Sequence, residues 1–189
     1  RRAKEGPTGA PWKEGRKGVR PSVPLPMLAP RQKLWSSPLE AVEIALEMAA
    51  LGPEDVLYDI GCGDGRLVIE AAKRTGCRCV GVEIDEARAR ETRRRVREAG
   101  VDDRVSVRCE NGLETDVGEA SVVYLYLVPR GLRLLTPRLL SVREKRPLRV
   151  VSYMAPLPGL AHRTRRCAEP RAQPGAKFPL FYYVLSESE

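Results

Sequence analysis

Apolar and polar positions follow two different periods along most of this chain. Short apolar runs predict β-strands, at residues 56–60, 78–84, 104–109, 121–128 and 148–153. Between them, apolar positions recur with helical spacing, at 39–51, 66–74, 86–99 and 130–141. A last apolar run at 178–185 predicts one more strand after a Pro- and Arg-rich connection. Such alternation of strands and helices predicts an α/β fold with a mostly parallel sheet and helices on both faces.

The first helix has start and stop signals of its own. Ser37 is placed to cap its N-terminus, and Pro38 would occupy the first helical position. Gly52 and Pro53 end the pattern. Residues 1–37 show no periodicity and are rich in Pro, Gly, Lys and Arg. We therefore divide the chain into a basic N-terminal extension, 1–37, and a folded domain, 38–189.

The net charge of +8 is distributed unevenly. Residues 1–35 hold nine Lys and Arg against two acids, and residues 138–177 hold ten against two. The segment between them has more acidic than basic residues. The basic ends predict contact with an acidic partner, such as RNA, anionic lipid or an acidic protein face, with a solvated surface as the alternative.

Composition restricts the chemistry further. The five cysteines are odd in number and form no C-x-x-C motif, which favours free thiols in a reducing compartment. With a single histidine in the chain, we expect no metal site. The chain contains no run of eighteen apolar residues, so we predict no transmembrane segment.

The stretch Asp59-Ile60-Gly61-Cys62-Gly63-Asp64-Gly65 lies between a predicted strand and a predicted helix. Glycines at such a turn let the backbone bend tightly and approach a ligand, and the next helix points its free N–H groups there. A dinucleotide site has the spacing G-x-G-x-x-G, whereas this loop reads G-x-G-x-G. Two carboxylates would repel a pyrophosphate, and they suit a cationic ligand such as S-adenosylmethionine.

A further acid supports this interpretation. Glu83 ends the next predicted strand, about twenty residues after the loop. At that position a carboxylate can accept hydrogen bonds from both hydroxyls of a ribose. A tight turn without a ligand remains the alternative for the glycines alone.

These motifs resemble those of the class I, seven-β-strand methyltransferases. Within that class the chain looks similar to the protein-lysine methyltransferases of the ATP synthase c-subunit and adenine nucleotide translocase type, over residues 36–160. The segments SPLEAVEIALEM, VVYLYLVPRGLRLLTPRLL and VVSYMAPLPGL carry this closer likeness. The resemblance implies a Rossmann-like, doubly wound seven-stranded sheet and S-adenosylmethionine as cofactor. It implies cofactor contacts from eight residues: Asp59, Gly61, Cys62, Gly63, Gly65, Glu83, Ile84 and Asn111.

The sequence departs from the family pattern at several points. Asn111 stands where an aspartate usually binds the adenine amino group, and its carbonyl oxygen can still accept a hydrogen bond. Leu34-Trp35-Ser36 replaces a Pro/aromatic stretch that closes over the cofactor. A basic tail replaces the hydrophobic anchoring segment, and an aromatic residue near Leu160 is missing.

For a lysine substrate, the acceptor amine must lose its proton before it attacks, although its free pKa is about 10.4. No dedicated base is evident in the sequence, so the catalytic residues stay unassigned. Residues placed to shape the acceptor channel are Trp35, Tyr126, Pro129 and Tyr153.

Three functions fit the sequence. The first is an S-adenosylmethionine-dependent methyltransferase acting on protein lysine. The second is a methyltransferase fold that serves as a structural subunit of a large assembly, such as a mitochondrial ribosome, with basic tails on RNA or protein. The third is an RNA methyltransferase, although the chain has Leu127-Val128-Pro129 where many of these carry N/D-P-P-[FY]. The family resemblance and the basic N-terminus predict the mitochondrial matrix, with the cytoplasm as the alternative.

Overall fold

A computed structural model describes residues 35–143 and 147–186 of the chain. Most of the predicted N-terminal extension, residues 1–34, lies outside the described residues. The described residues form four helices: α1 (Leu39–Ala49), α2 (Arg66–Thr75), α3 (Glu86–Glu98) and α4 (Pro129–Arg143). They form seven strands: β1 (Val56–Ile60), β2 (Arg78–Glu83), β3 (Val105–Cys109), β4 (Val122–Leu125), β5 (Leu148–Tyr153), β6 (Thr164–Ala168) and β7 (Phe178–Leu185).

The strands make one sheet in the order β3-β2-β1-β4-β5-β7-β6. Strands β1 to β5 run parallel, and β7 pairs antiparallel with both β5 and β6. The order reverses direction at β1, which pairs with β2 on one side and with β4 on the other. In open α/β sheets, ligands bind at such a switch point, beyond the carboxyl ends of the strands. The mostly parallel, Rossmann-like architecture expected from the sequence is confirmed.

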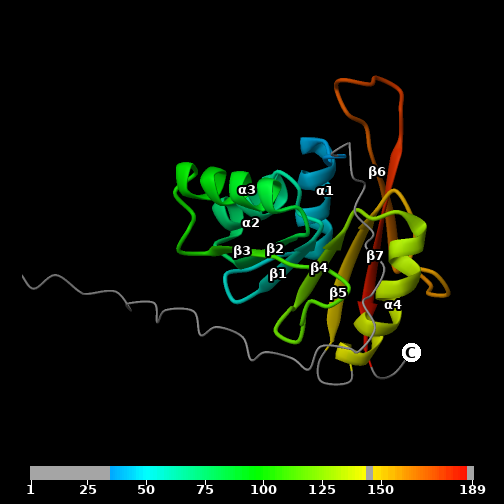
Figure 1. The fold of residues 1–189 in the computed structure, drawn as a ribbon. Helices are drawn as coiled ribbons and strands as arrows, with labels where there is room; N and C mark the ends of the chain where they lie inside the picture. The colour runs from blue at the N-terminus through cyan, green and yellow to red at the C-terminus, as the bar shows by residue number, and fades with distance from the viewer. Residues whose placement is uncertain (1–34, 144–146, 187–189) are drawn as a thin grey trace, which may run out of the picture.

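Helices cover both faces of the sheet, as Figure 1 shows. Helices α1, α2 and α3 pack on one face, where Val42, Val68 and Val96 are buried against alternate residues of the strands. Helix α4 packs on the other face through Leu132 and Leu139. The segment 110–121, which links β3 to β4, contains no helix and covers this second face with apolar residues of its own. The strands alternate between the two cores because successive side chains point to opposite faces.

Two local expectations were wrong. The hydroxyl of Ser37 does not cap α1 but shares a hydrogen bond with the Tyr124 hydroxyl at 2.7 Å, and Pro38 is itself the N-cap. Tyr124 is buried, so its hydroxyl needs a polar partner more than the first turn of the helix does. Strand β6 (Thr164–Ala168) was not expected, because its sequence TRRCA has no apolar alternation. Its side chains are largely exposed, as suits an edge strand that carries charges.

No helix within the described residues has both the length and the apolar composition needed to cross a bilayer.

Candidate active site

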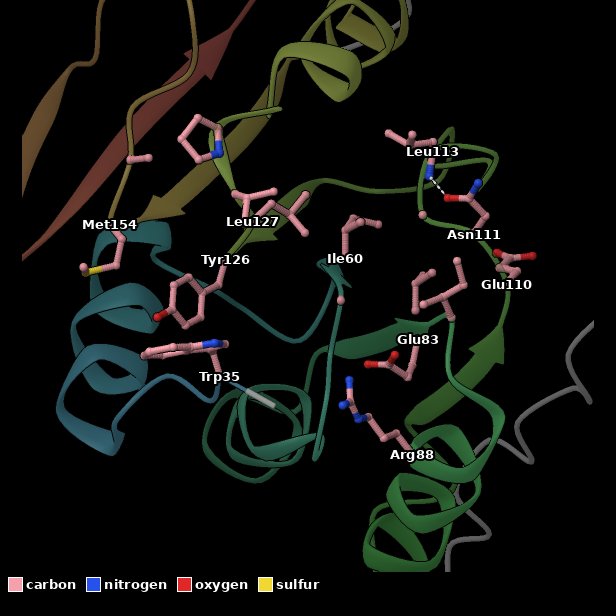
Figure 2. Close-up of a pocket in the computed structure, with 17 residues that line it drawn as sticks. Trp35, Ile60, Glu83, Arg88, Glu110, Asn111, Leu113, Tyr126, Leu127 and Met154 are labelled. Atoms are coloured by element: carbon pink, nitrogen blue, oxygen red, sulfur yellow. Dashed lines mark hydrogen bonds between the residues drawn. The ribbon is translucent and has the colours of Figure 1, made fainter. Parts of the chain in front are cut away.

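A cavity of about 430 Å³ opens at the carboxyl ends of β1, β2, β4 and β5 (Figure 2). This volume falls in the range of small-molecule sites, about 300 to 1,000 Å³. Charged and amide side chains line the end near β2 and β3: Glu83, Arg88, Glu110 and Asn111. Aromatic and aliphatic residues line the end near β4 and β5: Trp35, Tyr126, Leu127, Val128, Pro129, Met154 and Ala155.

The glycine loop turns between β1 and α2 in a conformation that needs glycine. Gly61, Gly63 and Gly65 have φ of 89°, 55° and 76°, in the left-handed region that L-residues rarely adopt. The amide of Gly61 donates to the Val82 carbonyl at 2.8 Å, which ties the loop to the end of β2. A Cβ at Gly65 would lie 2.4 Å from Cγ2 of Thr92, so α3 also packs closely on the loop. Backbone and packing together bring the loop to the cavity floor.

Glu83 connects the end of β2 to this loop. Its buried carboxylate accepts hydrogen bonds from the Gly63 amide and from the Asp85 amide, both at 3.0 Å. From the far side, the hydroxyl of Thr92 donates to the Gly63 carbonyl at 2.6 Å. The carboxylate therefore has a fixed position at the edge of the cavity, where a ribose would present its hydroxyls.

Asp59 lies at the inner end of the loop and is almost fully buried. Burial, followed by the negative charges of Glu83 and Asp64, raises the pKa of Asp59 to about 8. A buried carboxyl beside other acids is costly unless a cation compensates it. The site is thus electrostatically suited to a positively charged ligand group.

Asp64, the second acid of the loop, is paired within the protein. Its carboxylate lies 2.5 Å from Nη2 of Arg66 and 3.5 Å from Nη1 of Arg95. The Arg66 guanidinium is the main cause of a lowered Asp64 pKa, although burial opposes it. The argument from two acids for a cationic ligand therefore applies to Asp59 and not to Asp64.

Arg66 also holds the segment that precedes α1. Its Nη1 donates to the Ser37 carbonyl at 2.9 Å, while the Ser37 hydroxyl bonds with Tyr124. Ser36 donates weakly to Asp64 at 3.4 Å. These contacts place Trp35 at the rim of the cavity, where 62% of the residue is exposed.

The opposite end of the cavity is built by the turn after β3. The side-chain oxygen of Asn111 accepts a hydrogen bond from the Leu113 amide at 3.1 Å, which leaves it one further lone pair. A Cβ at Gly112 would lie 2.5 Å from Cγ2 of Ile60, so only glycine lets this turn approach β1. Ile84 lines the same end and offers an apolar surface to a flat ring.

The predicted residues divide into two groups. Those that line the cavity are Gly61, Glu83, Ile84 and Asn111 among the cofactor residues, and Trp35, Tyr126 and Pro129 among the channel residues. Those that stand behind the lining are Asp59, Cys62, Gly63, Gly65 and Tyr153.

Two of the residues behind the lining have clear packing partners. Cys62 is buried against Gly81, where a Cβ would lie 2.9 Å from its Sγ, and burial raises the pKa of its thiol. Tyr153 packs edge-on behind Tyr126, with ring centroids 4.7 Å apart. Cys62 and Tyr153 therefore shape the site through their neighbours.

Sequence reasoning missed Arg88, Gly112, Leu113 and Met154, which line the cavity. The Asn-Gly pair directly after a strand was a local signal for the turn at Gly112. Arg88 lies in the first turn of α3, shortly after Glu83, but it is one of six arginines in that helix, so nothing in the sequence distinguished it. Met154 carries no sequence signal, because its place depends on strand pairing.

The residues present fit S-adenosylmethionine. Its positive charge matches the buried carboxyl of Asp59, which stands behind the lining, and its ribose matches the fixed carboxylate of Glu83. The cavity has the size, and the glycine loop the bare backbone, that such a ligand needs.

Comparisons with known proteins agree with this fit. The ANTKMT methyltransferase domain family matches residues 59–164. A protein-lysine N-methyltransferase of Saccharolobus islandicus is 40% identical over 119 residues, which are 62% of this chain and 73% of the relative. The crystal structure of an RNA methyltransferase from Salinibacter ruber with S-adenosyl-L-homocysteine is 34% identical, with a TM-score of 0.72 over 82% of this chain and 96% of that chain.

A geranyl diphosphate C-methyltransferase from Streptomyces coelicolor, solved with S-adenosyl-L-homocysteine, is 20% identical with a TM-score of 0.59, over 77% of this chain and 78% of that chain. At this identity it supports the fold alone. The family match and the two relatives above 30% identity support the cofactor as well as the fold. The chain belongs to the ANTKMT methyltransferase domain family and is an S-adenosylmethionine-dependent methyltransferase.

Proposed function

We propose that this methyltransferase acts on the side-chain amine of lysine in a protein. The observation that carries the proposal is the lining of the cavity near β4 and β5, which is aromatic and aliphatic. Among the lining residues described there, tyrosine is the only ionisable type. A long aliphatic side chain with a terminal amine fits such a channel, and the Saccharolobus islandicus relative bears the name of a protein-lysine methyltransferase.

The channel would supply the protonation state that the reaction needs. S-adenosylmethionine supplies a methyl group on a sulfonium, which an uncharged amine can attack directly. The apolar lining around Tyr126 would reduce the contact of the amine with water, and desolvation lowers the pKa of a lysine amine. Burial raises the pKa of Tyr126, and that of Tyr153 to about 12, so neither phenol is a base at neutral pH. Desolvation and alignment of the amine are therefore the contributions of this chain.

The test is methyl transfer from radiolabelled S-adenosylmethionine into an extract of cells that lack the protein. We expect label in protein, recovered as methylated lysine after acid hydrolysis, and no label with Gly63→Arg. Label that resists protease and is released by ribonuclease would contradict the proposal.

RNA is the second candidate substrate, because the Salinibacter ruber relative is described as an RNA methyltransferase and is 34% identical. The ribonuclease arm of the same experiment decides between the two. The relatives and the cavity do not favour the structural-subunit alternative.

The mitochondrial matrix location and the contact of the basic ends with RNA or protein stay predictions from the sequence. Fractionation of cells that express the full-length protein with a C-terminal tag would test the location. Recovery of the protein in the cytosolic fraction alone would contradict it.

A further inference from the structure

We propose that Trp35, Tyr126 and Met154 form a subsite that binds an alkylammonium group through aromatic faces and sulfur. This inference rests on the proposed function, because it assigns the part of the site that receives the lysine amine once it carries a transferred methyl group and a positive charge. Figure 2 shows the three side chains together, on the side of the cavity away from Asn111 and Glu110.

The backbone of Met154 carries the first argument. Met154 has φ of 72°. Within the described part of the chain, Ala50 is the only other non-glycine residue with a positive φ. Ala50 ends a helix, where this conformation is common, whereas Met154 directly follows β5. Its amide donates to the Pro179 carbonyl at 2.8 Å, which holds the strained position. Strain of this kind gathers at functional sites.

The side chain of Met154 gives the second argument. It lines the cavity and the residue is 40% exposed, although methionine is usually buried. A left-handed backbone turn after the last residue of β5 therefore presents a polarizable thioether at the cavity entrance. Sulfur of this type contacts aromatic rings favourably.

The two aromatic residues are held from behind. The ring of Tyr153 packs edge-on against Tyr126, at an interplanar angle of 66°. Trp35 is anchored through Ser37, whose carbonyl accepts from Arg66 and whose hydroxyl bonds with Tyr124. The Tyr126 ring is thus supported by Tyr153, and the backbone that presents Trp35 to the entrance is held two residues further along, with Trp35 62% exposed.

Charge decides the kind of ligand. The acids that line the cavity are Glu83 and Glu110, and both belong to the end formed by β2 and β3. At the other end, a cation meets aromatic faces, which attract alkylammonium groups by cation–π interaction. An amine that gains methyl groups sheds water more readily, so the subsite suits a methylated amine better than a free ammonium.

The experiment uses the full chain labelled at its methionine methyl groups with ¹³C, with S-adenosyl-L-homocysteine in saturating excess. The chain has three methionines, Met27, Met48 and Met154, so Met154→Leu assigns the reporting signal. Choline is titrated as the cation and 3,3-dimethylbutan-1-ol as its neutral isostere. We expect choline to shift the Met154 signal with saturation, and the alcohol to bind at least fivefold more weakly. Met48 lies within α1 and packs against the core, so its signal should not move.

Trp35→Leu should weaken choline binding at least fivefold when S-adenosyl-L-homocysteine is kept saturating. Met154→Gly should weaken choline binding while thermal stability stays equal or rises, since glycine relieves the left-handed backbone. Equal binding of choline and the alcohol would overturn the cation–π subsite, and so would the absence of any Met154 shift. These results are independent of the protein-or-RNA assay, so failure of the subsite and failure of the proposed function are distinguishable.

Discussion

The carboxylate of Glu83 accepts a hydrogen bond from the Gly63 amide at 3.0 Å, so the acid at the end of β2 holds the glycine loop that follows β1. One residue thus has two tasks. It holds the glycine loop in place, and we predict that it also presents an acceptor to the ribose of the cofactor. The loop and the acid therefore form a single unit, although they are twenty positions apart in the sequence.

Replacement of Glu83 by glutamine removes the negative charge and keeps the size of the side chain. An amide side chain has one acceptor atom for the two backbone N–H groups that Glu83 receives, and a hydrogen bond to a charged group is worth about 1.5–3 kcal/mol. We expect affinity for S-adenosylmethionine to fall about 10- to 100-fold, measured by calorimetry. Glu86→Gln is the matched control, because Glu86 is exposed and pairs only at 3.3 Å with Arg90. Equal affinities for the two variants would contradict the assignment.

Asp59 should lower the free energy of unfolding of the cofactor-free protein near neutral pH. Its pKa is about 8 when folded and about 3.9 in an unfolded chain, so the unfolded state releases the proton first as pH rises. The contribution of Asp59 to the free energy of unfolding therefore falls between about pH 4 and pH 8. Asp59→Asn removes this fall. Between pH 5 and pH 8, we expect the free energy of unfolding of the variant to rise by at least about 1.4 kcal/mol relative to that of the wild type.

The same substitution should weaken binding of the cationic cofactor at least tenfold, so stability and affinity change in opposite directions. Urea unfolding across the pH range measures the first effect and calorimetry the second. A stability difference between wild type and Asp59→Asn that is constant from pH 5 to pH 8 would show that Asp59 is ionised throughout.

Gly65→Ala should destabilise the fold for two separable reasons. The new Cβ would lie 2.4 Å from Cγ2 of Thr92, and φ of 76° is strained for alanine. Overpacking costs about 1–3 kcal/mol and the left-handed backbone about 1–2 kcal/mol. Thr92→Ser removes the offending methyl group and keeps the hydroxyl that donates to Gly63. We expect urea unfolding to show that the double variant recovers the packing cost alone; a double variant no more stable than Gly65→Ala would contradict the packing argument.

Arg66→Lys should loosen the segment that carries Trp35. The guanidinium joins Asp64 to the Ser37 carbonyl, and a lysine ammonium lacks the planar fork for both. We expect faster hydrogen exchange at the amides of residues 35–37. Arg74→Lys, on the same helix but paired with Glu43 and Glu70 away from the cavity, is the control. Unchanged hydrogen exchange in Arg66→Lys would mean that the Ser37–Tyr124 hydrogen bond alone holds residues 35–37 in place.

Much of the fold followed from local signals. The spans of β1, β5 and β7 agree with the predicted ranges, because short, largely apolar runs mark strands of a buried sheet. The glycine loop and Glu83 were predictable because their chemistry is local in sequence. Strand β6 was not, since an exposed edge strand has no apolar period and is defined by its pairing with β7.

The acceptor end was only partly predictable. Tyr126 and Pro129 follow β4 directly, so their place at the sheet edge could be read from the chain. Met154 owes its position to a hydrogen bond with Pro179, a residue twenty-five positions away. The role of Ser37 was misjudged for a similar reason, because its partner Tyr124 is distant in sequence and buried.

Calorimetric titration of the full chain with S-adenosylmethionine tests the central claim most directly. Gly63→Arg serves as the comparison, because Gly63 is buried and has φ of 55°, so an arginine there would have a strained backbone and a buried charge. The account predicts micromolar affinity in the wild type and none in the variant, with both proteins folded by circular dichroism. A folded wild-type protein that binds no S-adenosylmethionine would contradict it.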